Sequence, residues 1–140
     1  MKFLLFIPFI LIFSACSVGS IYTPSYYSET RLGDALYRVT FQGGRAPMTG
    51  DLCLLRCAEV TLSADKKYFQ VVDSESGNSF NSFPAVNPFH DNHFNDDPFI
   101  NDIPFVTKTI RISNNSSLAE FVYDAEVINS SMRRKYEIKK

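Results

Sequence analysis

The first 16 residues limit how much of this chain is available to form a folded domain. A single lysine precedes an unbroken apolar run, Phe3–Phe13, which is followed by Ser-Ala and then by Cys16. A short positive segment, an apolar stretch and a small-residue cleavage site are typical of a secretory signal peptide. The apolar run is 11 residues long, whereas a helix that crosses a bilayer needs about 20. We therefore expect residues 1–15 to be a cleaved signal peptide and not a transmembrane helix.

The residues around Cys16 indicate what happens at the cleavage site. The sequence Phe-Ser-Ala-Cys resembles the lipobox of bacterial lipoproteins, whose cysteine is diacylated, and we expect a lipid on Cys16. Leucine usually stands where this chain has Phe13, so ordinary cleavage after Ser17 or Gly19 stays open as an alternative, which would give a soluble periplasmic or secreted protein. Because Ser17 follows Cys16, the sorting rule of two-membrane bacteria predicts an outer-membrane lipoprotein that faces the periplasm.

The length and charge of the mature chain bound its class. Removal of residues 1–15 from the 140-residue chain leaves 125 residues, enough for one domain and too few for two. The formal net charge of −1 does not favour a nucleic-acid partner. The expected organisation is a lipidated N-terminus and tether at 16–25, a single domain at 26–135 and a basic tail at 136–140.

Two strand patterns open the predicted domain. Residues 36–42 alternate, with Tyr37, Val39 and Phe41 on one face and polar side chains on the other. Residues 26–31 form a second strand candidate, and the Gly-Asp pair between the two segments suits a tight turn. These patterns predict an antiparallel hairpin.

Apolar residues at helical spacing follow, in a segment that begins at Pro47 or Thr49 and runs to about Ala64. Cys53 and Cys57 lie four residues apart in it, which places their Cβ atoms about 5–6 Å apart on a helix. A disulfide needs about 3.5–4.5 Å, so we expect two small buried hydrophobic residues, with a redox or metal-binding pair as the alternative. A narrow polar stripe is expected to consist of Arg56, Glu59 and Ser63, with Leu52 among them.

The middle of the chain changes in character after a third strand pattern. Residues 68–73 are aromatic and β-branched, which favours a strand. Residues 74–104 are rich in Asn, Ser, Asp, Pro and Phe and show little periodicity, so we expect a long loop there. A loop of this length in a small domain is usually functional or flexible.

Two further patterns complete the predicted domain. Residues 105–112 alternate as a strand, with Ile110 facing the core and Lys108 facing outward. The sequence Ser-Leu-Ala-Glu is a capping box that opens a helical pattern over 118–135. The expected fold is α+β with two layers, in which two helices cover a mainly antiparallel sheet of about four strands. The elements follow in the order strand, strand, helix, strand, long loop, strand, helix.

Four motifs of the domain stand in a fixed order along the chain. They are Tyr-Ser-Glu-Thr-Arg-Leu at 27–32, Tyr-Arg-Val-Thr-Phe-Gln-Gly at 37–43, Leu-Arg-Cys-Ala-Glu at 55–59 and Tyr-Phe-Gln-Val-Val-Asp at 68–73. In this order they resemble a family of short bacterial lipoproteins that are named only after caulobacter loci. The family has Ala where this chain has Cys57, which fits a buried site for a small residue. The resemblance implies a lipoprotein and implies no catalytic residue.

Metal-ligand residue types cluster once in the predicted loop. His90 and His93 are three residues apart and are followed by Asp96, and imidazole and carboxylate groups at such spacing can chelate a divalent metal in a turn. The alternative is that these are exposed residues of a tract rich in Asn and Asp. The cluster is therefore a candidate metal site only.

Phenylalanine recurs through the same loop, interleaved with proline and acidic residues. Aromatic rings at such positions can dock onto a partner protein or a membrane interface, or they can fold back to cover an open part of the sheet. The candidate partner-binding residues are Phe83, Phe89, Phe94 and Phe99.

No nucleophile elbow, phosphate-binding loop or HExxH motif occurs in the sequence. We therefore expect a protein without catalytic activity or cofactor, attached to the membrane through a lipid on Cys16 and acting as a small structural or binding module toward an envelope protein. The alternative is a periplasmic metal-binding accessory protein or hydrolase that uses His90 and His93.

Overall fold

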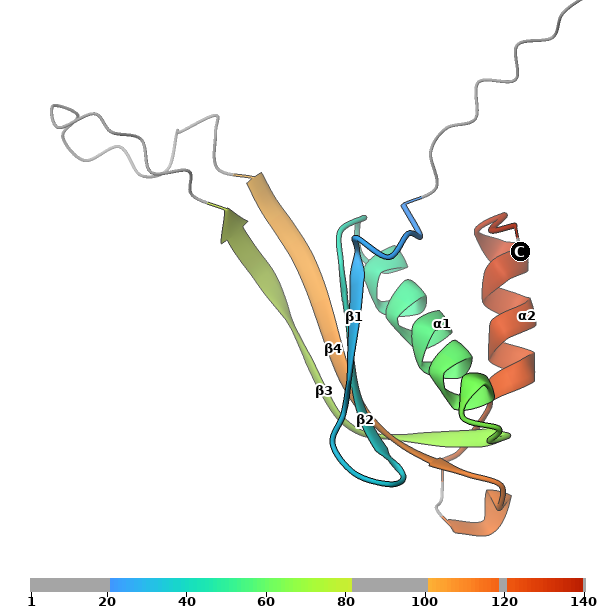
Figure 1. The fold of residues 1–140 in the computed structure, drawn as a ribbon. Helices are drawn as coiled ribbons and strands as arrows, with labels where there is room; N and C mark the ends of the chain where they lie inside the picture. The colour runs from blue at the N-terminus through green and yellow to red at the C-terminus, as the bar shows by residue number, and fades with distance from the viewer. Residues whose placement is uncertain (1–20, 82–100, 119–120, 140) are drawn as a thin grey trace, which may run out of the picture.

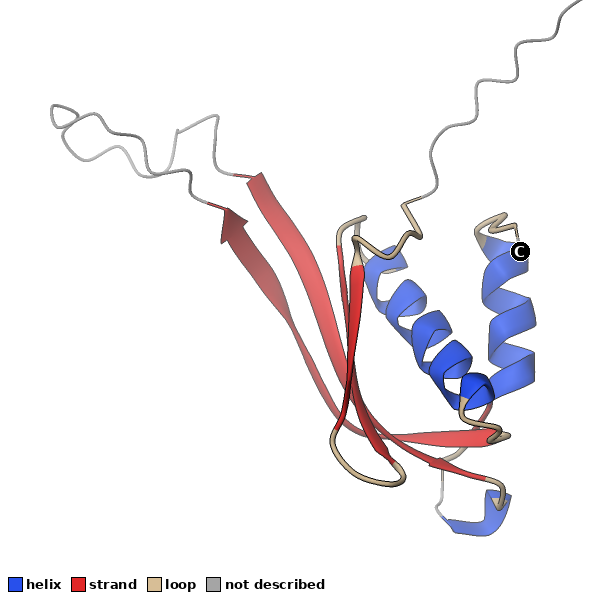
Figure 2. Ribbon diagram, viewed as in Figure 1, coloured by secondary structure: helices blue, strands red, loops and turns tan. Residues whose placement is uncertain are grey.

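A five-stranded antiparallel sheet forms one layer of the domain, and two helices cover one of its faces (Figures 1 and 2). The computed structural model describes residues 21–81, 101–118 and 121–139. The strand order in the sheet is β1-β2-β4-β3-β5. The elements are β1 (Tyr27–Arg31), β2 (Leu36–Gln42), α1 (Met48–Ser63), β3 (Tyr68–Asn81), β4 (Asn101–Ser113), a 3-10 turn (Ser116–Leu118), β5 (Tyr123–Asp124) and α2 (Ala125–Lys135). The α+β prediction is confirmed, with five strands instead of about four.

The core lies between the sheet and α1. Alternation along β2 turns Val39 and Phe41 toward the helices, where both are fully buried. The matching apolar face of α1 includes Leu55, Cys53 and Cys57, also fully buried. The stripe predicted on the other side of α1 is wrong in one member, because Leu52 is only 1% exposed and belongs to the core.

Two consecutive glycines end β2 and turn the chain into α1. Gly43 has a φ of +104°, and a Cβ placed on it would lie 2.9 Å from Cδ1 of Tyr26. A side chain at this position would be strained both by the backbone conformation and by this contact. The close approach lets Tyr26 pack beside the β2–α1 connection, and the hydroxyl of Thr49 in α1 donates to the carbonyl oxygen of Gly43 at 2.8 Å.

The loop expected at 74–104 is shorter, because both flanking strands continue into it. β3 pairs with β4 from Tyr68 as far as the pair Asn81 and Asn101. Its residues after Asp73 are mostly small and polar and show no apolar alternation, so the pattern that marks a half-buried strand is missing. Main-chain pairing with β4 forms the strand instead.

Lys108 was expected to face outward, and this prediction is wrong. In the sheet Lys108 lies opposite Val39, whose side chain is buried under α1. Opposite residues of an antiparallel pair share a face, so Lys108 is on the helix-covered side, where its Nζ donates to Oγ of Ser74 at 3.2 Å. Lys108 stands two residues before Ile110, and residues two apart on a strand share a face. The sequence spacing alone therefore places Lys108 on the same face as Ile110.

The second helix begins later than the capping box predicts. Asp124 caps α2 by accepting from the amides of Glu126 at 2.9 Å and Val127 at 3.2 Å. The two residues before the helix are taken up by β5, in which Tyr123 pairs with Phe69. Contact with β3 therefore overrides the local helix signal at the start of the predicted segment. Neither described helix is long and apolar enough to span a bilayer.

Candidate functional site

The carboxylate of Glu59 in α1 accepts hydrogen bonds from three side chains, one of which belongs to α2. Its Oε2 accepts from the hydroxyl of Tyr22 at 2.5 Å and from Nη1 of Arg56 at 3.0 Å. Its Oε1 accepts from Nη2 of Arg133 in α2. The Glu59 side chain is only 15% exposed, so this carboxylate depends on protein donors instead of water. We call these four residues the Glu59 cluster.

Arg56 extends the cluster to the edge of the sheet. Its Nε and Nη2 donate to Oε2 of Glu29 in β1 at 2.9 Å and 2.6 Å, and its Cζ lies 4.2 Å from the centre of the Tyr27 ring. Burial would lower the pKa of Arg56, but hydrogen bonds to Glu59 and Glu29 outweigh it and raise the pKa above its ordinary value. The guanidinium is thus charged and shared between two carboxylates.

Tyr22 connects the cluster to the N-terminal end of the described chain. Burial is the main cause that raises its pKa well above the ordinary value, and the hydrogen bond to Glu59 raises it further. Its ring stacks on Phe41 with centroids 6.1 Å apart. The phenol therefore stays protonated and acts as a hydrogen-bond donor that holds the N-terminal segment against α1.

The tether predicted at 16–25 is correspondingly too long. Ile21 and Tyr22 both pack against the hydrophobic core. The folded domain therefore begins by residue 21, and only residues 17–20 separate it from Cys16.

A second polar contact joins the two helices near the start of α1. Oδ2 of Asp51 accepts from Nζ of Lys135 and from the hydroxyl of Tyr136, both at 2.6 Å. Burial would raise the pKa of Asp51, yet these two hydrogen bonds lower it below its ordinary value. The contact fastens the end of α2 to the first turn of α1.

Sequence patterns had singled out only part of these contacts. The polar stripe expected on α1 includes Arg56 and Glu59, which form an i, i+3 ion pair. Arg31 at the end of β1 forms an ion pair with Asp34 at 3.1 Å. Tyr22 and Arg133 were not identified, because partners 37 and 74 residues from Glu59 leave no local spacing signal.

Cys53 and Cys57 behave as the sequence predicts. Both are free thiols, buried in the core. Sγ of Cys53 contacts the carbonyl oxygen of Val39 at 3.6 Å. The hydrogen bond with Cys53, together with burial, raises the pKa of the Cys57 thiol. The same hydrogen bond lowers the pKa of Cys53. The complete burial of both side chains in the core supports the packing interpretation.

The other predicted site residues lie outside the described part of the chain. They are Cys16, the candidate metal ligands His90, His93 and Asp96, and the phenylalanines Phe83, Phe89, Phe94 and Phe99. The metal-site alternative therefore stays a prediction. Within residues 21–81, 101–118 and 121–139, no three His, Cys, Asp or Glu side chains lie together as a metal site would require.

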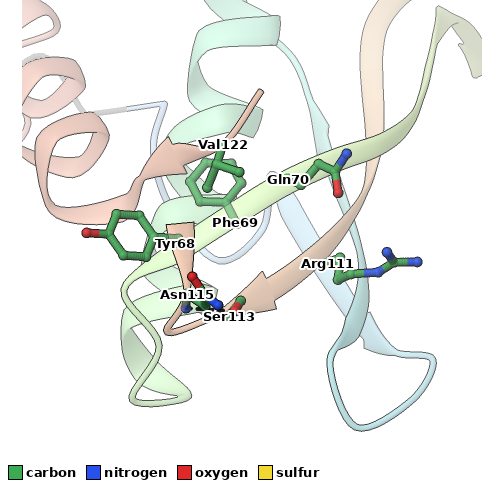
Figure 3. A pocket seen from close by; sticks show the side chains of 7 residues that line it. All are labelled: Tyr68, Phe69, Gln70, Arg111, Ser113, Asn115 and Val122. Atoms are coloured by element: carbon green, nitrogen blue, oxygen red, sulfur yellow. Dashed lines mark hydrogen bonds between the residues drawn. The ribbon is translucent and has the colours of Figure 1, made fainter. Parts of the chain in front are cut away.

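A shallow depression on the sheet is shown in Figure 3. Its cavity volume of about 10 Å³ has room for roughly one water molecule. Its lining comes from β3, β4 and the segments after β4, namely Tyr68, Phe69, Gln70, Arg111, Ser113, Asn115 and Val122. A depression of this size does not hold an organic substrate.

Comparison with known proteins adds no assignment: no family model, curated protein or solved structure matches the chain. The resemblance to the lipoprotein family therefore rests on the four sequence motifs alone.

In the described domain, no buried side-chain nitrogen or oxygen lacks a hydrogen-bond partner. The donors and acceptors of the Glu59 cluster are thus engaged with one another, as expected of a structural ion-pair network.

Proposed function

We propose that this protein is a lipid-anchored lipoprotein of the cell envelope, attached to the outer membrane through Cys16, which acts as a non-enzymatic binding module. The observation that carries the proposal is the extension of β3 and β4 beyond the rest of the sheet (Figure 1). We infer that this extension presents residues 82–100 to an envelope partner.

The extension is a two-stranded arm, defined as residues 78–81 of β3 and 101–104 of β4. The last pair between β2 and β4 is Gln42 with Phe105, whereas the β3–β4 pairing continues to Asn81 and Asn101. Within the arm, the side chains of Asn78 and Asp102 are exposed. Two strands without a covered face are marginally stable, so the arm adds little to the stability of the core and is available for binding.

The segment joined to the arm contains the candidate partner-binding phenylalanines. Asn81 and Asn101, the described residues on either side of this segment, are cross-strand partners at the tip of the arm. Interface residues are enriched in aromatic side chains because these bury a large area with few rotatable bonds. We infer that the arm supplies the paired base of this binding segment.

The arm also makes a clean deletion possible. Replacement of residues 82–100 by Asn-Gly should close β3 and β4 as a two-residue hairpin, because that dipeptide favours the required type I′ turn. We expect the domain to unfold within about 3 °C of the parent, since no core residue is removed, and we expect loss of partner proteins cross-linked in intact envelopes.

The matched control retains the segment and changes only its rings. Serine at Phe83, Phe89, Phe94 and Phe99 should abolish the same cross-links if aromatic contacts mediate binding. Retention of every cross-linked partner in the Asn-Gly variant, with normal membrane attachment, would disprove the binding role of the segment.

Membrane attachment is tested separately at Cys16. The Cys16→Ser variant is expected to leave the membrane fraction, because a serine hydroxyl cannot receive the thioether-linked diacylglycerol, and a removed lipid anchor removes most membrane affinity. Mass spectrometry of the parent N-terminus should find acyl chains on Cys16. An unmodified N-terminus that begins after Ser17 or Gly19 would contradict the lipoprotein assignment.

A further inference from the structure

One end of the domain gathers its N-terminal residues, the start of α1 and the end of α2 (Figure 1). Ile21 lies against Gly44 in the β2–α1 connection, beside Met48. Lys135 and Tyr136, at the end of α2, both bond Asp51 in the first turn of α1. We call this region the anchor end and define it by Ile21, residues 43–51 and residues 133–139.

The chain between Cys16 and Ile21 limits how this end can be oriented. Five residues of fully extended chain span at most about 18 Å. The 16 residues of α1 rise about 24 Å from the anchor end to the opposite end. Because the tether is shorter than α1, a domain held by a lipid on Cys16 cannot invert to place its opposite end on the bilayer.

Three of the five positive side chains at the anchor end form no ion pair with the described residues. The side chains of Arg45, Arg134 and Lys139 are exposed and form no ion pair with the described residues. Arg133 and Lys135, the other two cations, bond Glu59 and Asp51, so the carboxylate of Asp51 is already engaged. Glu137 is the exposed acid that offsets part of this charge.

An aromatic side chain stands at the same end. Tyr26 is 38% exposed and its ring lies against Gly43. Tyrosine is enriched at the membrane–water interface, because its ring is apolar and its hydroxyl is hydrated. A tyrosine beside exposed cations is the residue combination that an anionic phospholipid surface favours.

We propose that the anchor end is a membrane-facing surface that binds anionic phospholipid headgroups through Arg45, Arg134 and Lys139. The inference rests on the proposed lipid anchor for its orientation, and it adds a second, electrostatic contact to that anchor. Each Lys or Arg close to an anionic surface strengthens binding about five-fold. One lipid anchor with a basic patch holds a protein more firmly than the lipid alone.

Vesicle binding of the mature chain carrying Cys16→Ser tests the surface without the lipid. Vesicles of phosphatidylcholine with about 30% phosphatidylglycerol should bind the protein, and pure phosphatidylcholine vesicles should bind it at least ten-fold more weakly. Binding should fall in about 0.5 M salt, where screening shortens the range of the attraction. Equal binding to both vesicle types would overturn the proposal.

Matched charge reversals locate the surface. Glutamate at Arg45, Arg134 and Lys139 should weaken binding to the anionic vesicles at least ten-fold. Glutamate at Lys66, Lys67 and Arg111, which lie toward the opposite end, changes the net charge equally and should weaken binding less than three-fold. An equal loss in both triple variants would overturn the proposal.

Two further measurements distinguish a failure of the membrane-facing surface from a failure of the lipid anchor. If the first triple variant does not fold, the exposed single substitutions Arg134→Gln and Lys139→Gln should each weaken binding about five-fold, and no loss in either would contradict the surface. Because these proteins carry no acyl chain, failure of vesicle binding leaves the Cys16 lipid untouched. An unmodified Cys16 in the parent would refute the anchor and leave the vesicle result standing.

Discussion

Glu59→Gln is expected to lower the free energy of unfolding by about 2–4 kcal/mol. The substitution keeps the shape of the side chain but removes the charge that Arg56 and Arg133 both face. Arg56 would keep its bonds to Glu29, whereas Arg133 would keep only neutral acceptors, Asn129 and the carbonyl oxygen of Lys139. The amide nitrogen of the new glutamine is a donor and cannot accept from either guanidinium group. The loss should be large because the cluster joins α1 to α2 and to the N-terminal segment at Tyr22.

Denaturant unfolding of the parent and the variant measures this effect, and the melting temperature should fall by about 10 °C. Glu75→Gln is the matched control, because Glu75 is exposed on β3 and its substitution should change stability by no more than about 0.5 kcal/mol. A Glu59 variant as stable as the control would show that the cluster is not a structural network. Tyr22→Phe is then made in the parent and in the Glu59→Gln variant. The resulting double-mutant cycle measures the free energy of the Tyr22–Glu59 contact separately.

Phe69→Ala is expected to lower the free energy of unfolding by about 3–5 kcal/mol. Phe69 is 1% exposed, and its ring stacks on that of Tyr123 with centroids 5.2 Å apart. Because Tyr123 belongs to the two-residue strand directly before α2, removal of the ring leaves a cavity and also weakens the attachment of that helix.

Hydrogen exchange distinguishes this effect from a uniform loss of stability. Backbone amides of α2 should lose more protection than those of α1 under conditions in which the variant stays folded. Tyr123→Ala, which removes the partly exposed ring of the same pair, should cost only about 1 kcal/mol. Equal loss of protection in the two helices would contradict a local role for the Phe69–Tyr123 contact.

Strong periodicity explains why the first half of the fold was predictable. β2 occupies the predicted residues 36–42, and α1 differs from the predicted segment by about one residue at each end. In both, one apolar face is buried along the whole element, so the spacing of apolar residues reports the structure directly. The same reasoning identified Cys53 and Cys57 as core residues.

Pairing between distant segments explains what was missed. Residues 74–79 of β3 show no apolar alternation, so nothing in their spacing distinguishes a strand from a loop. Asp124, and not the capping box, begins α2, because β5 first pairs with β3. Tyr22 was placed in the tether because its contact with Glu59 spans 37 residues.

The sequence alone determined the α+β class, the helix that carries the buried cysteines and the candidate lipidation motif at Cys16, since each depends on residues close together along the chain. The tertiary structure decided which residues meet: the Glu59 cluster, the arm that bears residues 82–100, and the anchor end five residues from Cys16. The physical reason is that these contacts depend on how the helices and strands pack. Local spacing reports which face of an element is apolar and carries no information about which distant partner that face will meet.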